Sequence, residues 1–203
     1  MRAIDLALIA VLATPCVVQA QAPESAELKS RLESGQPASP GQVTRTATGW
    51  KVATTASGFW WDPAMVGKKG FSVILNGDLS AKSPGNVFGV FVGGRDLVGR
   101  RPSYVSFQIK ADGTYRLEVW DQGENHNRIP WTQHRAITVA IGDEPTRYRI
   151  RLDVHPLRLD FVVNDIKMHS INRSTVRAEG IVGLRLGAGL NMDIADFLIE
   201  PID

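Results

Sequence analysis

The chain has 203 residues, a formal net charge of +2 at pH 7 and a single cysteine. The roughly 180 residues that follow an expected leader are enough for one hydrophobic core of ordinary size. Charge is nearly balanced and no long basic block occurs, so nucleic acid is not an expected partner.

The first segment has the pattern of a secretory signal peptide. An apolar run extends from Leu6 to Val18 and is preceded by Arg2. It is shorter than the roughly 20 residues of a membrane span. Val18 and Ala20 supply the small residues of a cleavage site. We therefore expect residues 1–20 to be a signal peptide cleaved after Ala20, and the mature protein to be periplasmic or secreted, with no integral membrane segment.

The only cysteine, Cys16, lies inside this expected leader. The mature chain would then contain no thiol and no disulfide, even in an oxidising compartment. Its stability would have to come from burial of an apolar core.

Residues 21–48 are rich in Pro, Ser and Gly and poor in apolar side chains. This composition predicts a flexible N-terminal segment with at most one docked turn.

From Gly49 onward, apolar and polar residues alternate with period two, and turn signals separate the runs. No stretch here has the pattern of an amphipathic helix of three turns. The pattern predicts an all-β domain over residues 49–203, built as a two-sheet antiparallel β-sandwich.

Two hairpins can be placed in register. Asn164 and Asp165 both tolerate the positive φ of a type I′ turn. A two-residue turn there would set His169 opposite Asp160, as a structural pair. In "FQIKADGTYRL" a three-residue loop sets Phe107 opposite Leu117, whereas a two-residue turn would set it opposite Glu118. Hydrophobic consistency favours the three-residue loop.

That register predicts the content of the opposite face of the hairpin. Tyr104 falls opposite Trp120, Ser106 opposite Glu118, and Gln108 opposite Arg116. Aromatic rings beside a carboxylate, an amide and a guanidinium are suited to a polar ligand. The same residues are also compatible with an ordinary solvated sheet face that has one aromatic contact and binds no ligand.

The stretch "SGFWWDP" predicts a strand that ends at Asp62 and Pro63. Phe59 and Trp61 share one face of such a strand and Trp60 takes the other. Packing explains both tryptophans. If one binds a ligand, Trp60 is the better candidate, with Trp120, Tyr104 and the loop residue Trp131 as neighbours.

The segments "GFWWDP", "FGVFVGG", "YVSFQIKADGTYRL", "LDFVVNDIKMHSI" and "GIVGLRLGAGLNMDIADF" together resemble secreted bacterial jelly-roll proteins of the concanavalin A-like lectin/glucanase superfamily. The resemblance runs from about Gly49 to Ile199 and is greatest to the laminin G-like and 3-keto-disaccharide hydrolase-like group. It implies two curved antiparallel sheets with ligands on the concave face or at its rim. Members include glycosidases, sugar-binding modules and adhesion modules.

The sequence does not carry a recognised catalytic pair. Retaining glycosidases need two carboxylates on one face, whereas Glu118, Asp121 and Glu124 are spaced by three residues. There is no Gly-x-Ser-x-Gly elbow and no phosphate-binding loop. We assign no catalytic residue.

Metal sites are equally weakly indicated. His126 and His134 share a polar stretch with Asp121, but their spacing matches no metal signature. Asp193 and Asp196 are candidates for a structural calcium, which needs six or more oxygens. We therefore assign neither a metal site nor a cofactor.

The sequence thus predicts an exported, non-catalytic recognition module with carbohydrate as the leading ligand class. The candidate ligand-binding residues are Trp60, Tyr104, Gln108, Arg116, Glu118, Trp120 and Trp131. Two alternatives stay open: a glycoside-acting enzyme that pairs Glu118 with His126 or His134, and a structural or partner-binding module of the envelope. The sequence does not identify the ligand or the oligomeric state.

Overall fold

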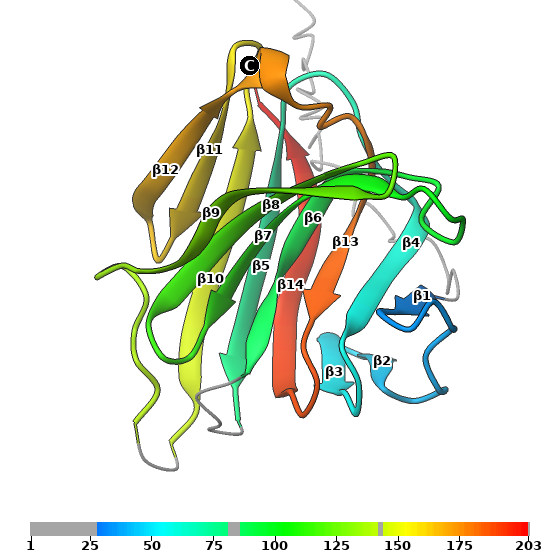
Figure 1. Ribbon diagram of the computed structural model, residues 1–203. Coiled ribbons are helices and arrows are strands. Elements are labelled where there is room, and N and C mark those ends of the chain that lie inside the picture. Colours follow the sequence, from blue (N-terminus) through cyan, green and yellow to red (C-terminus); the bar gives the residue numbers. More distant parts are fainter. Residues whose placement is uncertain (1–27, 81–85, 142–143, 203) are drawn as a thin grey trace, which may run out of the picture.

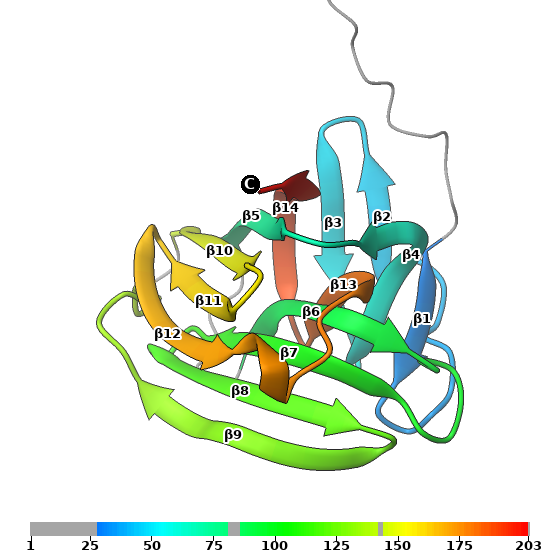
Figure 2. The same ribbon diagram turned by 90° about the horizontal axis from the view of Figure 1, so that it is seen from above.

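The computed structural model describes residues 28–80, 86–141 and 144–202. These residues form two antiparallel sheets of seven strands each, which face one another as two layers (Figures 1 and 2). The predicted all-β sandwich is confirmed. The helical residues of the described chain are confined to one 3-10 turn, η1 (Arg173–Thr175).

Sheet A has the strand order β1-β4-β13-β6-β7-β8-β9. Its strands are β1 (Lys29–Leu32), β4 (Gly58–Gly67), β6 (Val87–Arg95), β7 (Ser103–Lys110), β8 (Thr114–Asp121), β9 (Glu124–Gln133) and β13 (Gly180–Leu186).

Sheet B has the strand order β12-β11-β10-β5-β14-β3-β2. Its strands are β2 (Val43–Thr46), β3 (Gly49–Ala53), β5 (Phe71–Leu79), β10 (Thr146–Val154), β11 (Arg158–Val163), β12 (Ile166–Asn172) and β14 (Asn191–Pro201).

One hydrophobic core fills the space between the sheets. Alternate residues of β7 and β8 point into it, and Phe107 and Leu117 are fully buried there. Aromatic contacts cross between the layers: the ring centroids of Phe107 and Phe161 lie 5.2 Å apart, and those of Phe88 and Tyr148 lie 5.1 Å apart. Burial of apolar surface at about 25 cal/mol per Å² is the main stabilising contribution.

Both predicted hairpins are confirmed. Asn164 and Asp165 adopt φ values of 48° and 63°, as a type I′ turn requires. β7 and β8 pair Phe107 with Leu117, as hydrophobic consistency predicted. At their turn, Gly113 has φ 91° and its N–H donates to the carbonyl of Lys110 at 3.1 Å.

Two expectations are wrong, one about the pairing of β11 with β12 and one about the end of β4. A β-bulge after Phe161 sets His169 opposite Phe161 and Ser170 opposite Asp160, so the expected pair of His169 with Asp160 does not form. β4 also continues through Asp62 and Pro63 to Gly67. Proline is tolerated there because β4 is irregular at this point: its pairing with β13 shifts register between Gly183 and Ile181.

The stretch expected to be flexible, residues 21–48, contains two strands. β1 pairs with β4 at one edge of sheet A, and β2 pairs with β3 at one edge of sheet B. Leu32 and Val43 pack against the core. The folded domain therefore begins before residue 49. Short edge strands are held by backbone hydrogen bonds, which do not require alternating apolar side chains. The sequence pattern therefore does not reveal them.

The expected signal peptide lies outside the described residues. In the part of the chain that the structure does describe, no helix has the length and hydropathy that a membrane span requires.

Candidate ligand-binding face of sheet A

The outer face of sheet A, the one turned away from sheet B, carries most of the residues that the sequence singled out. In the pairing of β7 with β8, Tyr104 lies opposite Trp120, Ser106 opposite Glu118, and Gln108 opposite Arg116. Because adjacent strand residues point to opposite faces, the inward direction of Phe107 and Leu117 fixes the outward direction of these six.

Four side chains on this face form a connected hydrogen-bond network. Gln108 Nε2 donates to Ser106 Oγ at 2.7 Å and to Glu118 Oε2 at 2.9 Å. Arg116 donates to Gln108 Oε1 at 3.1 Å, and its guanidinium lies 3.4 Å from Glu118 Oε1.

The network is largely enclosed. Gln108 is fully buried and Glu118 is 5% exposed, whereas Arg116 is half-buried. Burial lowers the pKa of the Arg116 guanidinium, and the neighbouring Glu118 carboxylate opposes that change. Buried polar groups that are satisfied in this way rigidify their surroundings. Gln108 and Glu118 therefore position Arg116, and only Arg116 offers surface to a ligand.

Trp131 lies next to this network. It belongs to β9 rather than to the expected loop, because an edge strand with polar residues on both faces shows no alternation. Its ring centroid is 4.8 Å from Cζ of Arg116 and 4.1 Å from Nζ of Lys110. The half-buried indole and the two cations thus form one composite surface.

Tyr104 and Trp120 stack with ring centroids 5.8 Å apart and an interplanar angle of 21°. Tyr104 is only 5% exposed and contacts the ring of Phe59 edge-on at 4.9 Å. Burial raises the pKa of its phenol, which stays neutral. Tyr104 is thus a support for Trp120, and the half-buried Trp120 is the ring that solvent reaches.

The candidate Trp60 does not belong to this face. It lies opposite Leu184 in the pairing of β4 with β13, is 3% exposed and packs in the core between the sheets. Its remaining exposure faces a pocket of about 560 Å³ that Trp50 also lines. Its neighbour Trp61 points outward instead and is buried among Phe59, Phe91, Leu97 and Tyr104. Alternation alone cannot say which of two adjacent tryptophans points inward.

Sequence reasoning missed three residues of this face. Asn125 Nδ2 donates to Glu118 Oε1 at 3.1 Å, and Asn127 lies opposite Glu118. The buried Arg185 ion-pairs with Glu33, donates to the carbonyl of Gly58 at 3.1 Å and lies over the ring of Phe59. Arg185 could have been found, since the inward Leu184 and Leu186 imply that it points outward.

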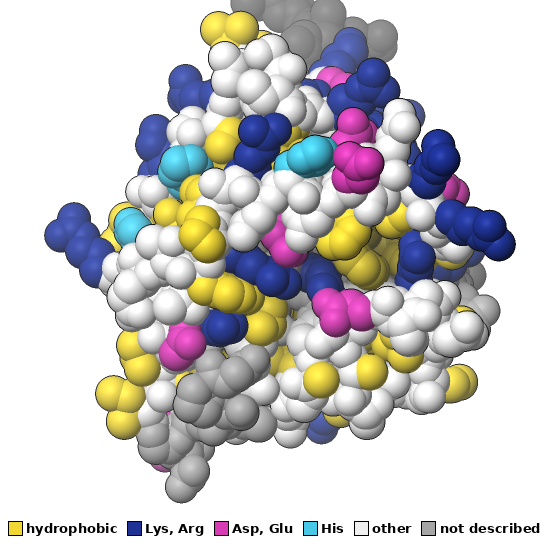
Figure 3. Space-filling view, in the orientation of Figure 1, with side chains coloured by type: hydrophobic (Ala, Val, Ile, Leu, Met, Phe, Trp, Pro, Cys, Tyr) yellow, Lys and Arg dark blue, Asp and Glu magenta, His cyan; other side chains and the backbone are white. Residues whose placement is uncertain are grey.

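The space-filling view shows sheet A in front. Basic, acidic and hydrophobic side chains lie interspersed across its middle (Figure 3). This mixture of apolar rings, cations, amides and a carboxylate suits a polar, uncharged or weakly charged ligand.

The catalytic pair considered for Glu118 is not assembled. His126 lies opposite Val119 and therefore points away from Glu118, which lies opposite Asn127. His134 accepts a hydrogen bond from the N–H of Ala136 and meets the ring of Tyr115 edge-on. Eight residues of nearly extended chain place the two histidines roughly 25 Å apart, too far for one metal ion.

The described residues include no group of three or more histidine, cysteine, aspartate or glutamate side chains that could hold a metal. Of the two expected calcium ligands, Asp196 accepts a hydrogen bond from Asn76 at 2.9 Å, and Asp193 lies opposite Asp78. These two aspartates are candidates only, and the sequence assigns no calcium site to them.

Known proteins share the fold but little sequence. No protein-family model matches the chain. A search of curated proteins also finds no match. Among solved structures, the carbohydrate-binding module CBM66 from Bacillus subtilis aligns with a TM-score of 0.60 and 12% identity, covering 79% of this chain and 91% of the module.

Two glucan-acting proteins align equally well. A GH16 protein of a Bacteroides ovatus mixed-linkage glucan locus, solved with a product, has a TM-score of 0.61 and 10% identity over 85% of this chain and 94% of its own. A β-glucanase from Bacillus licheniformis has a TM-score of 0.57 and 13% identity over 83% and 86%. At these identities the likeness establishes the fold. The chain has a concanavalin A-like jelly-roll fold, as the resemblance in its sequence implied.

Proposed function

We propose that the protein is an exported, non-catalytic module that binds carbohydrate on the outer face of sheet A. The exposed parts of Trp120 and Trp131 would contact the flat C–H faces of sugar rings. Arg116, Asn125 and Asn127 would hydrogen-bond hydroxyl groups. Gln108 and Glu118 would hold Arg116 and Asn125 in place without contacting the ligand.

One observation carries this proposal: the buried side chains of Gln108 and Glu118, whose polar atoms are all hydrogen-bonded or ion-paired, hold the Arg116 guanidinium against the partly exposed indole of Trp131. On a solvated sheet face that binds no ligand, polar side chains can hydrogen-bond to water. They do not require a fixed network of hydrogen bonds to one another. The network instead fixes donors before binding, which reduces the entropy lost on association. The occurrence of sugar-binding and glucan-acting proteins with this fold supports the same ligand class.

Glycoside hydrolysis has less support. Glu118 contacts Gln108, Arg116 and Asn125, and its neighbours on the same face of β8 are Arg116 and Trp120. A second carboxylate about 5 Å away, which retaining hydrolysis requires, is not among these contacts. Asp121 points to the other face.

Calorimetry of the mature protein against cell-wall and plant polysaccharides tests the proposal. A shallow site of this kind should bind with a Kd in the micromolar to millimolar range. Trp131→Ala and Arg116→Gln should each weaken binding by about five- to 150-fold, since stacking and charged hydrogen bonds each contribute about 1–3 kcal/mol.

The matched control is Trp50→Ala, which removes an indole that also contacts an arginine but lies on sheet B. It should leave binding unchanged. Absence of binding heat with every polysaccharide, or an equal loss of affinity in Trp50→Ala and Trp131→Ala, would count against carbohydrate binding at this face.

A further inference from the structure

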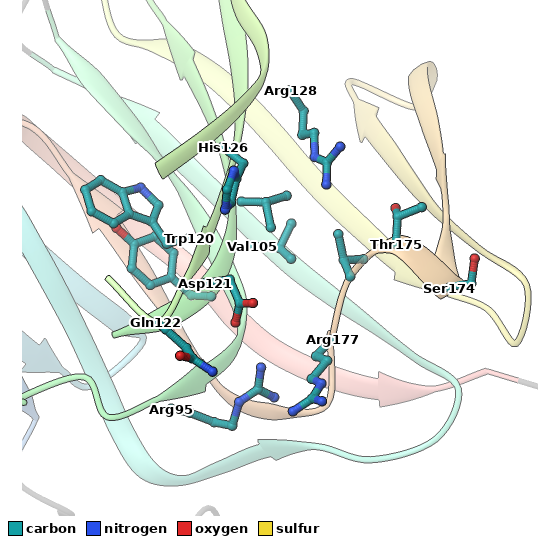
Figure 4. Close-up of a pocket in the computed structure, with 13 residues that line it drawn as sticks. Arg95, Val105, Trp120, Asp121, Gln122, His126, Arg128, Ser174, Thr175 and Arg177 are labelled. Carbon is teal, nitrogen blue, oxygen red and sulfur yellow. The ribbon is translucent and has the colours of Figure 1, made fainter. Parts of the chain in front are cut away.

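A second hollow lies at the end of the sandwich where β8 turns into β9. It has a volume of about 330 Å³ and is open to solvent. Four segments enclose it: the end of β6, the start of β7, the β8–β9 hairpin, and η1 with the residues that follow it (Figure 4). We call it the end pocket. Val105, Val119 and Val176 form its apolar floor, and Tyr104 and Trp120 connect it to the outer face of sheet A.

The end pocket is strongly basic. Arg95, Arg128 and Arg177 line it, each from a different segment, together with His126. Figure 4 shows Arg128 reaching in from β9, with Arg95 and Arg177 on the opposite side. Among the thirteen lining residues, the only carboxylate is that of Asp121, which accepts a hydrogen bond from Ser103 Oγ at 3.3 Å.

These guanidinium groups make few hydrogen bonds or ion pairs within the protein. Arg95 makes one long hydrogen bond, of 3.3 Å, to the carbonyl of Glu179. Within the described parts of the chain, the guanidinium groups of Arg128 and Arg177 make no hydrogen bond and no ion pair. Other arginines do have a carboxylate partner: Arg147 pairs with Asp78, and Arg173 with Glu179. Arg95 and Arg177 lie together on one wall and Arg128 on the other (Figure 4), and Asp121 supplies one carboxylate for the three positive charges. An anion in the pocket would offset the remaining positive charge.

The hydroxyl groups of the pocket play a smaller part. Ser174 Oγ donates to the side chain of Asn172, and Thr175 Oγ1 donates to its carbonyl. Neither proton is available to a ligand, so recognition falls on the guanidinium groups. Their planar fork of donors matches the geometry of a carboxylate, sulfate or phosphate ester.

We propose that the end pocket is an oxyanion-binding site in which Arg95, Arg128 and Arg177 hold a carboxylate, sulfate or phosphate group. The anion is either free in solution or a substituent of a saccharide. This site stands apart from the one proposed on sheet A, although the contact through Tyr104 and Trp120 would let one acidic glycan occupy both.

Calorimetry of the full mature chain tests this site with sodium sulfate, sodium glucuronate and neutral methyl glucoside. Sulfate and glucuronate should bind and methyl glucoside should not bind here. Arg128→Gln and Arg177→Gln should each weaken anion binding about three- to tenfold, the double change more, and added sodium chloride should weaken it further. Asp121→Asn should strengthen it about two- to fivefold, because it removes the opposing charge.

The matched control is Arg135→Gln. Arg135 is an exposed arginine in the chain that follows β9 and does not line the end pocket. It should leave anion binding unchanged. Equal losses in Arg135→Gln and Arg128→Gln, or no heat with either anion, would overturn the proposal.

Two further comparisons separate the sources of the anion and the two sites. Glucuronate binding much tighter than sulfate indicates a glycan-borne anion, and the reverse indicates a free one. Trp131→Ala should weaken neutral-glycan binding by the factor given above and leave sulfate binding intact. In the unmutated chain, absence of neutral-glycan binding alone counts against the sheet A site, and absence of sulfate binding alone counts against the end pocket.

Discussion

At the scale of single residues, Trp60 and Trp61 show that equal burial can serve different parts of the fold. Both are 3% exposed. Trp60 packs in the core between the two sheets, whereas Trp61 packs on the outer face of sheet A among aromatic neighbours. The outer face thus has a small apolar cluster of its own, which supports Tyr104 and through it Trp120.

We expect Trp60→Ala to lower the free energy of unfolding by about 3–5 kcal/mol, because it leaves a cavity in a closely packed core. Trp131→Ala should cost about 1 kcal/mol or less, since that indole is half-exposed and contributes mainly cation–π contacts. Urea denaturation of both variants measures the difference. Equal losses would mean that Trp131 is part of the structural core.

Asp160 makes stability depend on pH. Burial tends to raise its pKa, but hydrogen bonds from Ser170 and Arg158 outweigh this and lower it below the ordinary value. A carboxyl with a lowered folded-state pKa stabilises above its unfolded pKa of about 3.9, and that contribution is lost as pH falls through the folded value.

The unfolding free energy should therefore fall below about pH 4, and by less in Asp160→Asn, which cannot titrate. Ser170→Ala removes the hydrogen bond from the hydroxyl, keeps those from Arg158 and should give an intermediate slope. Urea denaturation at pH 5 and at pH 3 measures these slopes. An identical slope in wild type and Asp160→Asn would show that other carboxyl groups dominate acid unfolding.

The candidate site was predictable where alternation and register determine it. The register of the β7–β8 hairpin identifies Gln108, Arg116 and Glu118 as members of one face. Only one register of this hairpin pairs apolar residues with apolar residues. The preference for Trp60 over Trp61 as a ligand-binding residue of this face is wrong, because period two separates neighbours without saying which points inward. Asn125 was missed because both faces of β9 are polar, so the strand shows no alternation.

At the scale of elements, sequence pattern predicts central strands better than edges. β7 and β8 are buried on the core side, so a one-residue slip would expose Phe107 and Leu117 to water. β12 is an exposed edge strand, and the bulge that shifts His169 costs little burial there. β1 and β2 contribute few apolar side chains, and their docking depends on backbone pairing and on a few side-chain contacts.

Those contacts predict that the N-terminal strands stabilise the domain. Arg31 donates to the carbonyl of Leu97 at 2.8 Å, Ser30 Oγ accepts from the N–H of Ala38 at 3.0 Å, and Glu33 pairs with the buried Arg185. A chain that begins at residue 49 would lose all three and leave Arg185 without its carboxylate partner. Its unfolding free energy should be lower by at least about 2 kcal/mol.

A chain that begins at residue 28 is the control, because it keeps β1 and β2. Its melting temperature should match that of a chain beginning at residue 21. If the chain beginning at residue 49 melts at the same temperature as both, the two edge strands contribute nothing to stability.

At the scale of the whole molecule, the core makes the two sheets interdependent. Each sheet buries only one face against the other, and neither could retain a dry core alone. The ring of Phe161 on sheet B contacts Phe107 on sheet A, directly beneath the hairpin that carries the candidate face. The order of Gln108 and Glu118 on the outer face therefore depends on residues of the opposite sheet.

This arrangement predicts one cooperative unfolding transition. Phe161→Ala should lower the unfolding free energy by about 3–5 kcal/mol through the cavity it leaves. Sheet content, followed by far-ultraviolet circular dichroism, and the tryptophan environment, followed by fluorescence, should still change together. All five tryptophans belong to strands of sheet A or to β3 of sheet B, so fluorescence reports on both layers. Two separated transitions in Phe161→Ala would show that sheet A keeps its structure, and with it the candidate face, when its contact with sheet B is weakened.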